Sequence, residues 1–519
     1  MGILKSTSLV GGMTLLSRIS GLARDMVYSS AFGAGTLMDA FLVAFKIPNF
    51  LRRLTAEGAF SQAFVPVISE YRFKRDGSEV RQLVASVSGT FGLALFGLTL
   101  AGVLAAPLLV WLFAPGFADD AGRFDLTVAM LRLTFPYILF MSLVALASGV
   151  LNSYGRFGVP AFTPVLLNLV MIGFALGIAP SAEEPGLALA AGVFVAGLVQ
   201  LVIQLPALRG IRMLAWPRWN WRDSGVRRIA KLMLPGIFGS SVAQISLLLD
   251  TLIASFLVTG SIAWMYYADR LMEFPLGVFS IALATVILPR LSSHHTSEER
   301  GQFSSTLDWA LRLSVLIVIP AAAGLCLLAG PLTATIFGYG AFSARDVQMS
   351  SYALMAYSLG LCGFSFVKVL APGYFSRQDT RTPVRIGILS LGANLGFNVL
   401  VVVPAFLAGF GAPHALMALS TGLSAGLNSL LLYRGLRRSG VLVPGREWAR
   451  LLPRVGLASV AMGTFLWWAS GDWSAWSSWS IAERVVRLAS CVVGGGMVYF
   501  ATLAVTGLRP REVLGQKQG

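Results

Sequence analysis

The chain has 519 residues, of which 56% are hydrophobic and 12% are charged, whereas soluble globular domains carry about 25% charged residues. That composition excludes an ordinary soluble protein and predicts a chain that crosses a membrane many times. The 40 Lys and Arg residues outnumber the 24 Asp and Glu residues and give a net charge of +16. Because the basic residues lie in alternate loops rather than on a soluble module, we do not expect nucleic acid as a partner.

Long apolar stretches recur from one end of the chain to the other, and residues 91–111 and 187–205 are examples. A hydrocarbon core about 30 Å thick requires roughly 20 apolar residues per helix. A transmembrane barrel would show segments of about 10 residues that alternate in polarity, so the spans are predicted to be helices. The first apolar run lacks the cleavage site of a signal peptide, and we expect it to be retained as the first membrane helix.

Polar and Gly/Pro-containing loops divide the chain into about 14 candidate helices. The fold class that this predicts is an all-α polytopic membrane protein. We expect the helices to begin near residues 6, 36, 82, 125, 158, 187, 228, 262, 302, 347, 383, 412, 449 and 482.

Lys and Arg residues are unequally divided between alternate loops. One set of segments holds 26 of them, whereas the loops between hold only Arg123, Arg345 and Arg484. Because cytoplasmic loops carry the excess of basic residues, both termini are predicted to be cytoplasmic. The basic segments are 1–5, 71–82, 151–158, 207–231, 289–301, 376–386, 433–451 and 508–519.

A weak internal repeat is visible in the order of Gly, Asp and Pro residues. Transporters are commonly built from repeated halves, so we predict two pseudo-symmetric six-helix lobes, residues 1–227 and 228–445, followed by two further helices and a tail, residues 446–519. The repeat matches Gly35, Asp39, Pro48 and Pro66 with Gly260, Asp269, Pro275 and Pro289, and Tyr154 to Pro160 with Tyr374 to Pro383.

Charged residues interrupt several of the predicted membrane helices. Each costs several kcal/mol in a membrane helix and therefore marks a candidate functional site. At about 100° per residue, Asp39, Lys46, Arg53 and Glu57 of the second helix form one stripe, which predicts a polar cavity shared by the first, second and eighth helices. The residues are Arg18, Arg24 and Asp25 in the first helix, Asp39, Lys46, Arg52, Arg53 and Glu57 in the second, Asp250 in the seventh, Asp269, Arg270 and Glu273 in the eighth, and Lys368 in the tenth.

Two interpretations of these charges stay open. The acids could simply neutralise arginines as structural ion pairs, and Arg52 and Arg53 could reach the membrane interface from the end of their helix. The arginines also suit a substrate, because the planar guanidinium binds phosphate through two hydrogen bonds. A cavity rich in arginine therefore indicates an anionic, phosphorylated substrate.

No motif of an enzyme is present: the chain lacks a nucleotide-binding P-loop and the HExxH and GxSxG patterns. We therefore expect a transporter without a cofactor, driven by an ion gradient or by the membrane potential. Asp250, with Asn394 and Asn398, is a candidate sodium site, although an Asp in a membrane helix equally suits a pair with a neighbouring helix. Cys326, Cys362 and Cys491 lie far apart and predict neither a disulfide nor a metal site.

Seven motifs stand out along the chain, at residues 17–25, 32–35, 39–41, 45–49, 52–53, 56–66 and 266–275. They resemble the MurJ (MviN) family, and the resemblance extends over nearly the whole chain. It implies a lipid II flippase of the bacterial cytoplasmic (inner) membrane, with the fold of the multidrug/oligosaccharidyl-lipid/polysaccharide exporter superfamily. It also implies two lobes around a cationic cavity and a groove for the polyprenyl tail at the last two helices.

The resemblance assigns roles to the charged residues. Arg24 and Arg270 are expected to bind the pyrophosphate of lipid II, with the other basic residues supporting them and the acids gating by exchange of ion pairs. The expected partners are lipid II, membrane lipids and cell-wall synthesis enzymes. Two alternatives remain: an exporter of drugs or of another polyprenyl-linked glycan, and a scaffold that recruits cell-wall enzymes through its basic loops. The positions that match functional residues of the family are Arg18, Arg24, Asp39, Arg52, Arg53, Glu57, Asp269, Arg270 and Glu273.

Overall fold

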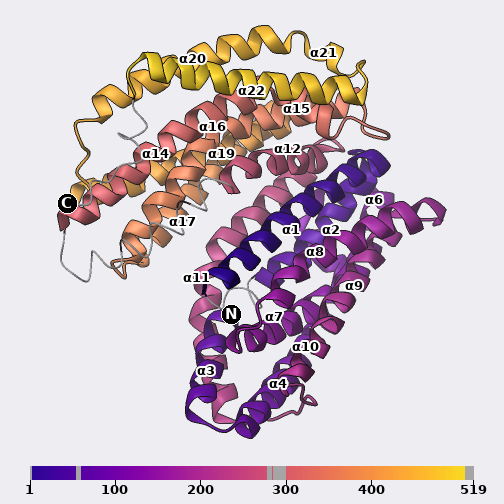
Figure 1. The fold of residues 1–519 in the computed structure, drawn as a ribbon. Coiled ribbons are helices and arrows are strands. Elements are labelled where there is room, and N and C mark those ends of the chain that lie inside the picture. The colour runs from indigo at the N-terminus through magenta and orange to yellow at the C-terminus, as the bar shows by residue number, and fades with distance from the viewer. Residues whose placement is uncertain (1–2, 54–59, 278–282, 284–290, 292–299, 509–519) are drawn as a thin grey trace. The chain divides into compact units, whose positions relative to one another are not determined.

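The computed structural model describes residues 3–53, 60–277, 283, 291 and 300–508, and these residues form helices joined by short loops, without a β-strand among them (Figure 1). Ten helices of this described part are long and apolar enough to cross a membrane. The chain is therefore an all-helical, multi-pass membrane protein. It divides into two compact units, Met1–Ala263 (the first unit) and Trp264–Gly519 (the second unit).

In the first unit, the helices pack around α9. That helix lies against α6, α7 and α8, while α1 packs on α8 and α2 packs on α6. The helices are α1 (Ile3–Phe32), α2 (Thr36–Arg52), α3 (Ser61–Lys74), α4 (Gly77–Leu104), α5 (Ala106–Phe113), η2 (Pro115–Phe117), α6 (Ala121–Thr134), α7 (Tyr137–Ser153), α8 (Gly158–Gly173), η3 (Phe174–Ile178), η4 (Ala179–Ser181), α9 (Pro185–Val202), α10 (Gln204–Gly210) and α11 (Ser224–Ser255).

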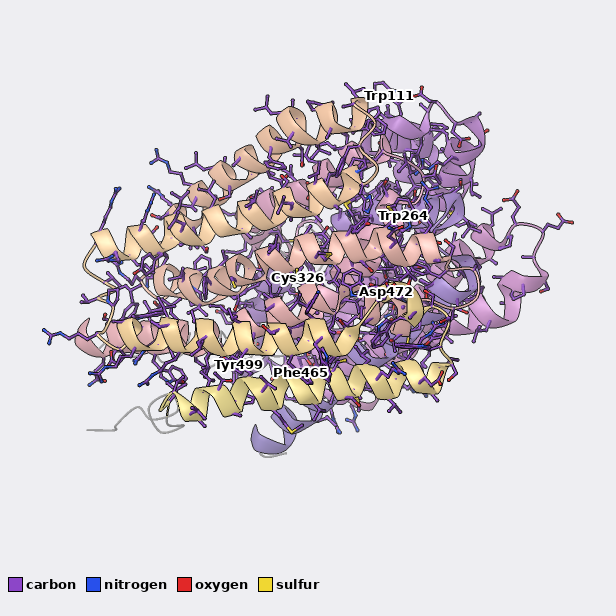
Figure 2. All side chains as sticks on the ribbon, turned by 90° about the horizontal axis from the view of Figure 1, so that it is seen from above. Trp111, Trp264, Cys326, Phe465, Asp472 and Tyr499 are labelled. Carbon is purple, nitrogen blue, oxygen red and sulfur yellow. The ribbon has the colours of Figure 1, made fainter. Side chains whose placement is uncertain are left out.

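In the second unit, α16 packs against α14 and α19, and α20 and α22 run side by side along α14 (Figure 1). Figure 2 labels Phe465 on α20 and Tyr499 on α22, and the Tyr499 hydroxyl donates to the carbonyl of Leu316 on α14 at 2.7 Å. The helices are α12 (Ser261–Pro275), which begins in the first unit, and α14 (Arg300–Leu327), α15 (Ala329–Ile336), α16 (Ala344–Phe375), α17 (Arg381–Phe397), η6 (Asn398–Val402), α18 (Val403–Leu407), α19 (Pro413–Arg438), α20 (Trp448–Ser470), α21 (Trp473–Trp476) and α22 (Ile481–Val505).

Small residues let α16 and α19 approach at backbone distance. A Cβ atom on Gly360 would lie 2.3 Å from the Cα of Gly422, and one on Gly363 would lie 2.5 Å from the backbone nitrogen of Gly426. Membrane helices associate through such close packing, because lipid tails are as apolar as the side chains that they would replace. The glycines are therefore required for this crossing.

A buried arginine holds the last helix to the rest of the second unit. The Arg484 guanidinium donates to the carbonyls of Ala334 and Gly338 at 3.1 and 3.0 Å, and to those of Ser477 and Trp479 at 2.6 and 2.9 Å. The first two carbonyls lie at the C-terminal end of α15, where helical carbonyls lack partners within the helix. Arg484 thus joins α15, α21 and α22.

The two units share a pattern of helix lengths and spacings. Helices α4 and α14 each have 28 residues, and after a single residue each is followed by an 8-residue helix, α5 or α15. The first residues of the pairs α4/α14, α6/α16 and α8/α17 are each separated by 223 positions. An internal duplication produces such matched lengths and spacings.

Irregular backbone repeats with the same spacing. Gly155 and Gln378, also 223 positions apart, have positive φ angles of 72° and 60°, and each lies in the turn before α8 or α17. Both of these helices continue into a π-helical segment of 5 residues, η3 or η6. Since π-helical segments are rare, their recurrence at matching places also indicates duplication.

The observed boundaries differ from the predicted ones at several places. Helix α11 packs on α3, α4 and α5 within the first unit, whereas the predicted lobe boundary at residue 227/228 assigns it to the second lobe. The two units are defined by compact packing, whereas the predicted lobes are defined by the sequence repeat. The division into lobes at 227 and 445 therefore stays a prediction. The second predicted helix was expected to carry Glu57, but α2 ends at Arg52 and Glu57 lies outside the described residues.

The placement of Arg123 in an outer loop was wrong. The Asp120 carboxylate accepts from the backbone N–H of Arg123 at 3.2 Å and caps α6, which begins at Ala121 rather than near residue 125. A capping carboxylate satisfies an N–H that has no partner within the helix. Arg123 consequently lies in the first turn of α6 and is only 5% exposed.

Candidate functional site

Arg24 and Asp25 form a buried polar cluster on α1. The Arg24 Nη2 atom lies 2.7 Å from Asp25 Oδ1, and the two residues are 8% and 1% exposed. Arg24 Nη1 also donates to Oδ1 of Asn168 on α8 at 3.1 Å, and the Asn168 amide donates to the Ser20 hydroxyl at 2.9 Å. Sequence reasoning missed Asn168, which is 144 positions from Arg24. The cluster fixes the guanidinium in one orientation.

Asp39 at the start of α2 is fully buried and accepts three hydrogen bonds. Arg123 Nη2 donates to Asp39 Oδ2 at 2.7 Å, and the backbone N–H groups of Gly260 and Ala263 donate to the same carboxylate at 2.7 and 2.9 Å. An acid at a helix N-terminus satisfies the N–H groups there and interacts favourably with the helix dipole. The carboxylate therefore ties α2 to α6 and to the beginning of α12, all within the first unit.

The rest of the predicted stripe on α2 becomes more exposed along the helix. Asp39 is buried, Lys46 is half-buried and Arg53 is exposed. The half-buried Arg52 donates through Nε to Asn49 Oδ1 at 3.0 Å. On α1, Arg18 is exposed. The predicted basic residues of the first unit thus range from a buried, oriented arginine to exposed side chains.

In the second unit, the predicted charges lie on α12 and α16. Arg270 Nη1 lies 3.0 Å from Glu273 Oε2, and its Cζ atom lies 4.9 Å from the centre of the Tyr266 ring. Asp269 is half-buried on the same helix. Lys368 on α16 is exposed and forms no ion pair with a residue that the structure describes. Arg270 is therefore oriented by an acid and an aromatic ring, whereas Lys368 is oriented by neither.

The structure pairs an acid with an arginine at three of the predicted places: Asp25 with Arg24, Asp39 with Arg123, and Glu273 with Arg270. These three acids thus form the ion pairs that the first interpretation expects. It does not remove the arginines as ligands, because a guanidinium has five N–H donors and a carboxylate occupies only part of them. The predicted cavity joins residues of both units and stays a prediction.

Two of the three predicted sodium ligands lie together in the second unit. The Asn398 amide donates to Asn394 Oδ1 at 2.8 Å, and the Ser420 hydroxyl donates to the same atom at 3.0 Å. Asn398 Oδ1 is buried without a hydrogen-bond partner among the described residues. An amide oxygen of this kind fits an oxygen-ligated cation. Asp250 is half-buried on α11 of the first unit.

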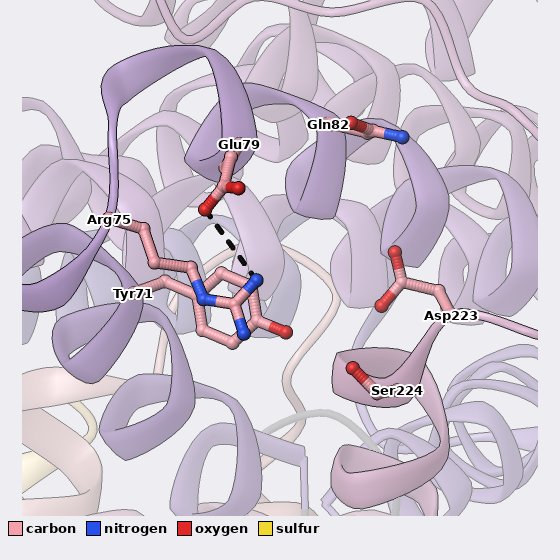
Figure 3. Close-up of a pocket in the computed structure, with 6 residues that line it drawn as sticks. All are labelled: Tyr71, Arg75, Glu79, Gln82, Asp223 and Ser224. Atoms are coloured by element: carbon pink, nitrogen blue, oxygen red, sulfur yellow. Dashed lines mark ion pairs between the residues drawn. The ribbon is translucent and has the colours of Figure 1, made fainter.

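A separate polar pocket lies between α3, α4 and the start of α11 (Figure 3). Arg75 pairs with Glu79 at 3.5 Å and lies over the ring of Tyr71, with its Cζ atom 4.3 Å from the ring centre. Asp223 accepts the Gly225 N–H at 2.8 Å and caps α11. Because its charges are already engaged with one another or with the backbone, the pocket is a structural junction rather than a second candidate site.

Comparisons with known proteins agree on one family. The sequence model of the family described as "Lipid II flippase MurJ" matches residues 28–487. The chain is 45% identical to a protein of Haemophilus influenzae named "Probable lipid II flippase MurJ", over 97% of this chain and 99% of that protein. It is 43% identical to "Lipid II flippase MurJ" of Burkholderia cenocepacia, over 98% of each chain.

A solved structure shows the same fold. The structure titled "Lipid II flippase MurJ, inward closed conformation" superposes with a TM-score of 0.79 at 24% sequence identity, and the match covers 96% of this chain and 98% of that one. Since the family model spans most of the chain and relatives above 40% identity span nearly all of it, the chain belongs to the lipid II flippase MurJ family.

Proposed function

We propose that this chain is a lipid II flippase of the bacterial cytoplasmic membrane, which moves the polyprenyl-pyrophosphate-linked peptidoglycan precursor from the inner to the outer leaflet. The observation that carries the proposal is 45% identity over 97% of the chain to a relative named for that activity. The multi-pass helical fold agrees with it. The process is transport and not enzymatic catalysis, since the lipid changes leaflet without a change in its covalent bonds.

The precursor's pyrophosphate is the group that the arginines would bind. Arg24 is buried and oriented by Asp25 and Asn168, so its guanidinium is held in one orientation without further loss of side-chain freedom. Arg270 is oriented by Glu273 and Tyr266. In a site that excludes bulk water, fixed guanidinium donors replace the hydration that the phosphates lose. The residues that would add positive charge around them are Arg18, Lys46, Arg52, Arg53 and Lys368.

Movement between inward-open and outward-open states would use the acids. Repeated transporters commonly alternate access by rocking one repeat against the other, here the lobes 1–227 and 228–445 with the helices of 446–519 beside them. Asp39 would stabilise one state, because it holds the beginning of α12 against α2 and α6. Asp25, Glu57, Asp269 and Glu273 would exchange arginine partners as the lobes move.

Fourteen membrane helices follow if the ten apolar helices are joined by α1, α2, α11 and α12, which carry most of the predicted site charges. The excess of basic residues in alternate loops favours cytoplasmic termini. Coupling would come from the membrane potential or from Na⁺ near Asp250, Asn394 and Asn398. Asn398 Oδ1, which is buried without a hydrogen-bond partner in the part of the chain that the structure describes, fits such an ion. The ion would supply the free energy of its gradient, and no other cofactor is needed. Cell-wall synthesis enzymes are proposed as partners.

The test measures lipid II exposed on the outer leaflet in cells depleted of their own flippase. The cells receive this chain, its Arg24→Ala/Arg270→Ala variant, or the control Arg437→Ala/Arg438→Ala, which changes two exposed arginines at the end of α19. We expect the parent and the control to restore exposure and the Arg24/Arg270 variant to lose at least about tenfold, the equivalent of 1.4 kcal/mol.

The outcomes separate the competing functions. If all three proteins restore exposure equally, the arginine assignment is wrong. If none restores it at matched abundance, the flippase proposal fails, and another substrate or a scaffold is indicated.

A further inference from the structure

The chain between α10 and α11 is an extended segment, residues 213–222, which we call the first strap. It lies along α4: the Arg218 N–H donates to the Ala85 carbonyl at 2.9 Å, and the Asn220 N–H donates to the Thr90 hydroxyl at 3.1 Å. A Cβ atom on Gly89 would lie 2.3 Å from the backbone of Arg218. The glycine therefore makes room for the strap, which is held at one fixed height on α4.

That height corresponds to the membrane interface. A helix needs roughly 20 residues to cross the hydrocarbon core. Counting back that length from Leu104 or from Phe113, the ends of α4 and α5, reaches Ala85 or Ala94, so the edge of the core lies in the stretch of α4 that the first strap contacts. With the orientation proposed above, this is the cytoplasmic leaflet. The inference thus rests on the proposed topology, although not on transport.

The side chains of the first strap suit that position. Trp216, Trp219 and Trp221 are 87%, 61% and 49% exposed, and tryptophan is enriched at membrane interfaces because its indole is apolar with one polar N–H. Four exposed arginines accompany them and form no ion pair with any described residue. These arginines are Arg209, Arg212, Arg218 and Arg222.

The second unit has a counterpart that serves as an internal comparison. Residues 441–447, the second strap, cross α14 at the position that is equivalent to the contact of the first strap on α4. The Val443 N–H donates to the Ser304 hydroxyl at 2.9 Å, and the Gly445 N–H donates to Asp308 Oδ1 at 3.4 Å. Asp308 lies 223 positions after Ala85, as α14 does after α4. The second strap contains no tryptophan. Trp448, which follows it, donates its indole N–H to Asp308 Oδ1 at 2.6 Å and so braces α14, whereas the three indoles of the first strap are exposed.

We propose that the first strap, together with Arg209 and Arg212 just before it, is a binding surface for anionic phospholipid headgroups, in which the three indoles insert among the headgroups and the four guanidinium groups bind lipid phosphates. Exposed aromatic area and uncompensated positive charge at one height complement an anionic bilayer surface. A protein partner would not require the tryptophans to lie at the edge of the hydrocarbon core. The second strap is not such a surface.

The first test locates the indoles. The purified full chain and its Trp216→Ala/Trp219→Ala/Trp221→Ala variant are placed in nanodiscs of phosphatidylcholine and phosphatidylglycerol that contain a headgroup-labelled nitroxide lipid, and the difference in fluorescence reports the three indoles. We expect the nitroxide lipid to quench the fluorescence of these three indoles at least about twofold more than aqueous iodide does. Quenching by iodide alone would overturn the proposal, because the strap would then face water, as a protein-docking surface does.

The second test addresses lipid charge. We expect phosphatidylglycerol to raise the thermal unfolding midpoint of the detergent-purified chain more than phosphatidylcholine does. Arg218→Gln/Arg222→Gln should lose at least half of that difference, whereas the control Arg437→Gln/Arg438→Gln should keep it. Equal effects of the two lipids on the parent would overturn the anionic preference. Neither readout depends on lipid II transport, so each can fail while the flippase proposal stands.

Discussion

The N-terminal ends of two equivalent helix pairs are joined by different chemistry in the two units. In the first unit, the fourth residue of α2, Asp39, pairs with the third residue of α6, Arg123, at 2.7 Å. In the second unit, the fourth residue of α12, Trp264, donates its indole N–H at 2.7 Å to the third residue of α16, Asp346. A charged pair thus stands where its counterpart has a neutral donor and an acid.

The two acids, Asp39 and Asp346, also differ in the segments from which they accept further hydrogen bonds. Asp346 accepts its other hydrogen bonds from Ser343 beside it, in a capping box of its own helix. Asp39 instead accepts from Gly260 and Ala263, which begin α12. Both units therefore keep the helix contact, while at this place the buried carboxylate of the first unit, Asp39, also binds a chain segment outside the pair.

The largest effect is expected from Asp39→Ala. It leaves the Arg123 guanidinium buried without its acid and removes the acceptor of two backbone N–H groups, so we expect a loss of about 3–5 kcal/mol in the free energy of unfolding. Asp346→Ala removes an acceptor whose donors, the Trp264 indole and Ser343, are neutral. It should lower the free energy of unfolding by about 1–3 kcal/mol. Unfolding of the purified variants in mixed micelles measures both losses. Equal losses would show that the two places are energetically equivalent, against the comparison.

Sequence reasoning reached the apolar spans, because apolar length and Gly/Pro breaks depend on a few neighbouring residues, but it did not reach the distant partners of the predicted site residues. It matched Asp39 with Asp269, whereas Trp264 is the fourth residue of α12 as Asp39 is of α2. Arg24 and Asp25 are adjacent, and their pairing was open to the same reasoning. Asn168 and Arg123 lie 144 and 84 positions from Arg24 and Asp39, and only the packing of α1 on α8 and of α2 on α6 brings them there.

A smaller effect should distinguish the helix crossings of the two units. In the first unit, the ring of Tyr137 at the start of α7 packs against Gly197, and a Cβ atom on Gly197 would lie 2.9 Å from that ring. In the second unit, the residue equivalent to Tyr137, 223 positions later, is Gly360, which lies against the backbone of Gly422. Gly360→Leu should cost about 1–3 kcal/mol, since backbone cannot rotate away from the added atoms.

The matched control for that crossing is Gly387→Leu on α17, where no atom lies within 4 Å of an added Cβ atom. We expect it to shift the thermal unfolding midpoint by less than half of the shift that Gly360→Leu causes. If both variants unfold at the same temperature, close backbone approach is not what stabilises the second unit's crossing.

The smallest effect concerns the turns before α8 and α17. Gly155 and Gln378 share a left-handed backbone, with φ angles of 72° and 60°, and an added Cβ atom on Gly155 would meet no atom within 4 Å. Gly155→Gln should therefore cost only the left-handed strain of an L-residue, about 1 kcal/mol. Gln378→Gly relieves that strain but gives the unfolded chain more freedom, so its net change should stay within about 0.5 kcal/mol. The free energies of unfolding of the two variants are compared in the same micelles.

A loss well above 1 kcal/mol for Gly155→Gln would mean that the first unit's turn has packing constraints that its counterpart lacks. The two turns would then share their backbone conformation but not their side-chain packing.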